Sequence, residues 1–102
     1  MSLFGEPQKS PHRDIERYIR REGDSPEDWY VGVTENWIAR LFSDHRVVDG
    51  KTLYIVRKCQ NNEMARQVKA ALLELMCDGE QVGQSNKSIF VYAYKKTIDT
   101  KP

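Results

Sequence analysis

The stretch that decides the fold is YVGVTENWIARLFSDH, residues 30–45 of a chain of 102 residues. Its first part is rich in aromatic and β-branched side chains, which predicts a strand over residues 29–34. The part that begins with WIARLF predicts a short helix over residues 37–43, with Thr34 or Asn36 capping its exposed amide groups. A strand followed by a tight turn and a helix is therefore the central unit of the fold.

Three side chains of this unit suggest phosphate chemistry. The order of elements lets the hydroxyl of Tyr30, the guanidinium of Arg40 and the imidazole of His45 converge in one solvent-open cleft. Phosphodiester cleavage adds negative charge to oxygens that an arginine or a metal ion stabilises, and it needs a group that accepts a proton. These three are the candidate catalytic residues. Each also has a structural interpretation, as a half-buried strand aromatic, a solvated helix residue and a helix C-terminal residue respectively.

The elements around this unit predict an α/β (α+β) fold. Helix and strand patterns alternate, so we expect a small three-stranded, mostly antiparallel sheet flanked by three helices. The elements are, in chain order, a helix opened by Ser10 as cap and Pro11 and ended at Gly23, the strand and helix of the central unit, a strand over 52–57, a helix over 63–76 capped by Asn61 or Asn62, a loop over 78–87 and a strand over 88–94.

The length of the chain predicts one domain with one modest core. We assign residues 1–10 to a mobile N-terminal arm, 11–96 to the domain and 97–102 to a frayed C-terminus. Hydrophobic residues make up 39% and charged residues 30% of the chain, which argues against general disorder. No apolar stretch is long enough to span a bilayer, so we expect a cytoplasmic protein without a membrane partner.

Charge and cysteine content restrict the other functions. The net charge of +1 does not by itself indicate a nucleic-acid partner, although arginines and lysines gather near both ends and in the middle of the chain. Cys59 and Cys77 are too few for a disulfide framework and belong to no zinc-binding pattern. Two buried, reduced thiols are expected.

The motif YVGVT, followed by Arg40 and then His45, resembles the second half of the signature of the GIY-YIG nuclease superfamily. In that signature Tyr-Ile-Gly-x-Thr precedes an arginine and a histidine. The resemblance implies a small sheet flanked by helices and cleavage of phosphodiester bonds with one divalent metal ion, Mg²⁺, held by a helix glutamate. It also implies that Arg40 stabilises phosphate charge while Tyr30 or His45 assists proton transfer.

Two features of the chain depart from the family's pattern. The upstream strand that should carry the first tyrosine motif is missing, and the strand over 88–94 is expected to fill its place in the sheet. The position of the metal-binding glutamate, four residues after Ala65, holds Lys69, which repels a divalent cation. Glu63 and Glu74 remain as weak metal candidates, although at about 100° per residue they lie roughly 120° and 140° around the helix from Lys69.

Two functions of different class therefore stay open. The first is a GIY-YIG-like endonuclease that uses Mg²⁺ if it is active. The second is a non-catalytic module that keeps the nuclease fold and binds nucleic acid or a protein partner. Lys69 as a phosphate contact, Trp37 as a platform for base stacking and Tyr92 are the candidate nucleic-acid-binding residues.

Overall fold

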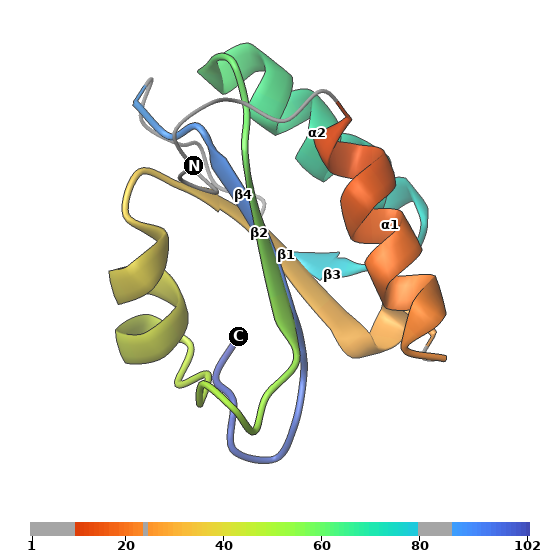
Figure 1. The fold of residues 1–102 in the computed structure, drawn as a ribbon, viewed down its shortest axis with the longest axis vertical. Coiled ribbons are helices and arrows are strands. Elements are labelled where there is room, and N and C mark those ends of the chain that lie inside the picture. The colour runs from red at the N-terminus through yellow and green to blue at the C-terminus, as the bar shows by residue number, and fades with distance from the viewer. Residues whose placement is uncertain (1–9, 24, 80–86) are drawn as a thin grey trace.

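The computed structural model describes residues 10–23, 25–79 and 87–102, and it shows a mixed four-stranded sheet with its two α-helices on one face (Figure 1). A short π-helix covers part of the other face. The elements are α1 (Pro11–Arg21), η1 (Pro26–Asp28), β1 (Trp29–Thr34), η2 (Ala39–Asp44), β2 (Tyr54–Lys58), α2 (Asn62–Glu74), β3 (Asp78–Gly79) and β4 (Phe90–Lys95).

The strands lie in the order β2-β4-β1-β3. Strand β4 runs antiparallel to both of its neighbours, so that Tyr92 lies opposite Gly32 of β1 and Val56 of β2. The expectation that the strand near the end of the chain lies beside YVGVT is therefore confirmed. The sheet has four strands and not three, because Asp78 and Gly79 pair in parallel with β1. An acid and a glycine carry no strand signal, so pattern alone assigned them to a loop. Most of that predicted loop lies outside the described residues.

The predicted helices are present, and their ends show how the sequence starts and stops them. Ser10 precedes Pro11 as expected, but its hydroxyl makes no capping hydrogen bond. Gly23 follows α1 with φ of 75°, a left-handed conformation that glycine adopts without strain. At the start of α2, the side chain of Asn61 accepts a hydrogen bond of 2.8 Å from the amide of Met64, which confirms one of the two predicted caps.

The helix of the central unit begins with the predicted cap, but its later turns are wider than those of an α-helix. The Oδ1 atom of Asn36 accepts from the amide of Ala39 at 3.2 Å, so the predicted cap is present. From residue 39 the hydrogen bonding is of the π type, and the amide of His45 donates to the carbonyl of Arg40, five residues earlier. This wider turn carries the chain to His45 directly over the sheet.

The two faces of the sheet hold different cores, because successive side chains of a strand point to opposite faces. The helix-covered face is aliphatic apart from Trp29 and two cysteines, and α2 contributes Ala65, Val68 and Leu72 to it. The opposite face is aromatic. Its buried members are Tyr30, Leu41, Val47, Val56, Tyr92 and Tyr94.

Of the two end segments predicted to lie outside the folded domain, the structure describes only the C-terminal one in full. Residues 1–9 of the expected arm lie outside the described residues. Residues 97–102, predicted to fray, instead return to the aromatic face, where the amide of Lys101 donates to the carbonyl of His45 at 2.8 Å. Within the described ranges, no helix is long and apolar enough to cross a membrane.

Candidate functional site

The aromatic face of the sheet brings His45 together with three tyrosines, Tyr30, Tyr92 and Tyr94, which we call the His45 cluster. The ring of His45 lies 4.9 Å from that of Tyr30 and 5.0 Å from that of Tyr94, measured between centroids. Only 4% of His45 and 7% of Tyr30 are exposed, and Tyr92 and Tyr94 are fully buried. The predicted meeting of Tyr30 and His45 is confirmed, but their predicted solvent-open cleft is wrong.

Both ring nitrogens of His45 have partners inside the protein. Nδ1 lies 2.7 Å from the carbonyl oxygen of Lys101, which can only accept, so Nδ1 carries hydrogen. In the neutral imidazole Nε2 is then the acceptor for the hydroxyl of Tyr92, also at 2.7 Å. The hydroxyl of Tyr94 lies 3.1 Å from Nδ1. A histidine with both nitrogens engaged in this way orients the surrounding backbone and phenols.

Gly32, at the centre of the YVGVT motif, is required for space. A Cβ atom at this position would overlap the phenol of Tyr92, which lies across the glycine from the neighbouring strand. Tyr92 has no room to move, since it is fully buried and hydrogen-bonded to His45. The glycine therefore admits the phenol that completes the His45 cluster.

The third predicted catalytic residue, Arg40, forms an ion pair with an acid of its own helix. Its Nη1 atom donates to Oδ2 of Asp44 at 3.2 Å, one turn along the same helix. Both side chains are at the surface, with 35% and 55% of their area exposed. Arg40 is thus more open to solvent than the buried rings of Tyr30 and His45.

The predicted metal and phosphate contacts belong to a helix on the opposite face of the sheet from the cluster. Helix α2 covers the other face of the sheet, so Lys69, Glu63 and Glu74 are separated from His45 by the strands. The two glutamates are exposed, and Lys69 is partly buried. Among the described residues, no group of three histidine, cysteine, aspartate or glutamate side chains is arranged to hold a metal ion.

Of the other predicted nucleic-acid contacts, Tyr92 is fully buried, so its assignment to a ligand surface is wrong. Trp37 is partly exposed and lines a groove of about 370 Å³ along strand β2. Tyr18, Arg21, Tyr54 and Arg57 line the same groove, which we call the β2 groove. The sequence suggested the arginines of the first helix, Arg21 among them, only as a possible backbone contact or a solvated face, and it gave no sign of the other three, because α1 and β2 are brought together only by the fold.

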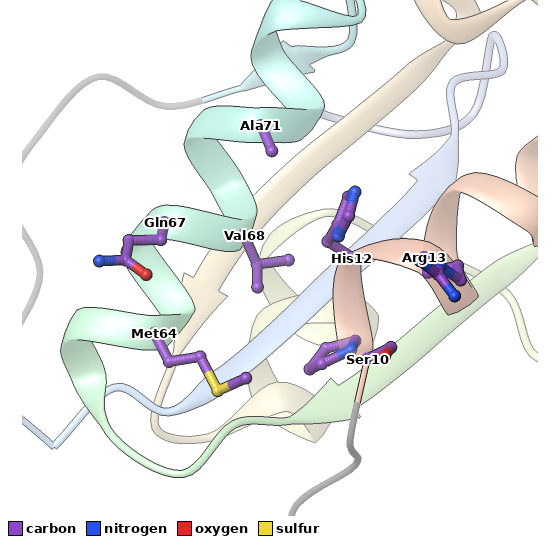
Figure 2. Close-up of a pocket in the computed structure, with 8 residues that line it drawn as sticks. Ser10, His12, Arg13, Met64, Gln67, Val68 and Ala71 are labelled. Atoms are coloured by element: carbon purple, nitrogen blue, oxygen red, sulfur yellow. The ribbon is translucent and has the colours of Figure 1, made fainter.

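A second hollow, of about 260 Å³, lies between the start of α1 and the middle of α2 (Figure 2). Met64, Gln67, Val68 and Ala71 form the α2 wall, and Ser10 to Arg13 form the other. Its lining combines aliphatic side chains with the ends of surface polar residues. It lies on the helical side of the sheet, away from the His45 cluster.

Cys59 and Cys77 are free and buried, as expected. Burial raises the pKa of each thiol to about 11. Because the thiolate is the reactive form, both side chains behave as small apolar core residues at neutral pH.

Searches against protein-family models, curated proteins and solved structures gave no match for this chain. The likeness to the GIY-YIG signature therefore depends on the residues of the motif alone. Function has to be inferred from the geometry of the His45 cluster and of the β2 groove.

Proposed function

We propose that this protein is a non-catalytic nucleic-acid-binding module that keeps a GIY-YIG-like arrangement of strands. The observation that carries the proposal is the burial of His45, with both ring nitrogens engaged by Tyr92 and by the carbonyl of Lys101. A general base must reach the proton that it abstracts. A fully occupied, buried imidazole does not meet that requirement, which favours a structural role.

The arrangement of strands supports the nuclease-like part of the proposal. Strand β1 carries YVGVT, and its antiparallel neighbour β4 carries Tyr92 and Tyr94. In this proposal β4, which comes from the end of the chain, takes the role of the tyrosine-bearing strand that the family's signature implies. A nuclease site that has lost its metal-binding glutamate and its access to solvent can persist as part of the hydrophobic core.

The charge of α1 supports a nucleic-acid partner. Its buried face consists of Pro11, Ile15 and Ile19, and its exposed face carries four arginines. Arginines on one helix face can follow a phosphate backbone, and the released counterions make such binding salt-dependent. The exposed arginines are Arg13, Arg17, Arg20 and Arg21.

The test is the fluorescence anisotropy of labelled single-stranded and duplex oligonucleotides as protein is added. We expect binding that weakens between about 50 and 200 mM salt. The double change of Arg17 and Arg21 to alanine should lower affinity at least about tenfold, whereas Arg66→Ala, an exposed arginine on α2, should leave it unchanged. If neither oligonucleotide binds at low salt, the proposal is wrong.

A metal-dependent endonuclease is the second candidate. The contact between Tyr30 and His45, at 4.9 Å between ring centroids, favours it, and Arg40 lies only five residues before the histidine. A plasmid-nicking assay with Mg²⁺ or Mn²⁺ compares the unmodified protein with Arg40→Ala and Lys69→Glu. Cleavage that Arg40→Ala abolishes would establish the enzyme and overturn the non-catalytic proposal.

A further inference from the structure

We propose that the β2 groove binds a single strand of nucleic acid, with bases stacked on its aromatic side chains and phosphates held by its arginines. This inference depends on the nucleic-acid binding proposed above and specifies the form of the ligand. Strand β2 is the outer strand of the sheet, with α1 on one side and η2 on the other (Figure 1). The groove therefore follows an open edge of the domain.

Two adjoining hollows lie along this edge, the β2 groove and a smaller one beside it. The larger, of about 370 Å³, extends from Tyr18 and Arg21 across β2 to Trp37. The smaller, of about 200 Å³, adds Arg17 and Asp14 on the α1 side. Tyr18, Arg21, Ile55 and Arg57 line both hollows, so they adjoin each other. An elongated ligand fits such a pair better than a compact one.

The aromatic rings of the groove are held in place by other rings. Tyr18 meets Trp29 edge to face at 5.7 Å, and Tyr54 meets Phe42 in the same way at 5.5 Å. Trp37 meets Phe42 at 6.3 Å. All three groove rings are partly exposed. Rings that are fixed before a base arrives lose little conformational freedom when it stacks on them.

The charges of the groove complement a polyanion. Arg21 and Arg57 line the β2 groove. Arg17 lines the adjoining smaller hollow together with one carboxylate, Asp14, which lies 3.1 Å from Nε of Arg57. The guanidinium carbon of Arg21 lies 5.1 Å from the centre of the Tyr18 ring. An arginine beside a stacking platform is the arrangement that single-stranded nucleic acid requires, because each base is linked to a phosphate.

The hydrogen bonding of β2 favours nucleic acid over a peptide that would extend the sheet. The amide of Cys59 donates to Ile89 and the carbonyl of Leu53 accepts from Lys95, so the odd-numbered residues of β2 face β4. The amides and carbonyls of its even-numbered residues face outward. The outward carbonyl of Val56 already accepts from Nη1 of Arg57 at 2.8 Å. An added peptide strand would have to displace this guanidinium.

The experiment compares labelled single-stranded and duplex oligonucleotides of the same sequence by anisotropy, and records tryptophan emission in parallel. We expect tighter binding of the single strand and quenching of Trp37. The matched variant Trp37→Phe leaves only Trp29, which is fully buried, so quenching should disappear. Tyr18→Leu should weaken single-strand binding by about tenfold and duplex binding hardly at all.

The results separate the two proposals. Equal affinity for single strand and duplex, with Tyr18→Leu neutral and the arginine changes harmful, would overturn the groove while leaving nucleic-acid binding intact. No binding of either oligonucleotide would overturn both. A polyglutamate peptide that displaces the labelled single strand as well as the unlabelled single strand does would also overturn the groove as a single-strand site. If Tyr18→Leu lowers the melting temperature severely, the test depends on Trp37→Phe. Quenching of tryptophan emission that persists in that variant would refute stacking of bases on Trp37.

Discussion

The His45 cluster and the β2 groove are made of similar residues and differ in their access to solvent. Each places tyrosines beside a side chain that can carry positive charge. In the cluster, η2 and the C-terminal residues cover His45 and leave 4% of it exposed. In the groove, Tyr18 and Tyr54 stay partly exposed beside arginines. Residue type therefore suggests a chemistry, and burial decides whether a ligand can use it.

Gly32→Ala should have the largest effect, and it tests whether the cluster is a rigid core. The new methyl group would overlap the buried phenol of Tyr92, so we expect the free energy of unfolding to fall by about 3 kcal/mol. Urea denaturation measures the change. In a Tyr92→Leu background the same substitution should cost less than about 1 kcal/mol, because the obstructing ring is gone. An equal cost in both backgrounds would contradict the close packing.

Removal of single hydroxyls tests which bond orients His45. Tyr92→Phe removes the hydroxyl that donates to Nε2 in a buried site, so it should cost about 1.5 kcal/mol. Tyr94→Phe should cost about 0.5 kcal/mol, because Nδ1 still donates to the carbonyl of Lys101. Urea denaturation of both variants measures the difference. Equal losses would reject the proposed roles of the two ring nitrogens.

Asp14→Asn should have the smallest effect, and it sharpens the assignment of the open site. It removes the carboxylate that lines the smaller hollow beside the β2 groove and releases Arg57 from its ion pair. We expect affinity for a single-stranded oligonucleotide to rise by about twofold, since an ion pair that is still in partial contact with solvent is weak. Asp44→Asn makes the same charge change outside the groove, beside Arg40. A gain in that control as large as in Asp14→Asn would show only a general charge effect.

Much of the fold could be predicted because local patterns were strong. The bounds of β1, the capping of α2 by Asn61 and the turn at Gly23 follow from propensity and from the geometry of helix ends. Strand β3 could not be predicted, because Asp78 and Gly79 become a strand only through their contact with β1. The π-type bonding before His45 is likewise a result of packing, since a sequence pattern does not distinguish it from an ordinary helix.

Less of the candidate site could be predicted. The motif placed Tyr30 and His45 together, as the structure does, but it did not show that both rings are buried while Arg40 lies at the surface beside Asp44. The partners of His45, Tyr92 and Lys101, lie 47 and 56 residues further along the chain. Contacts over such separations leave no periodic signal in a single sequence.

By itself, the sequence determined the order of the main helices and strands and the placement of apolar side chains on particular faces. It also identified residues 30–45 as the segment that carries the candidate catalytic side chains. These properties depend on backbone preferences and on side-chain period, which act over a few residues. Only the tertiary structure decided that His45 is buried and that Tyr18, Trp37 and Arg57 share a groove. Solvent access is a property of everything packed around a residue, and distant segments supply most of that packing.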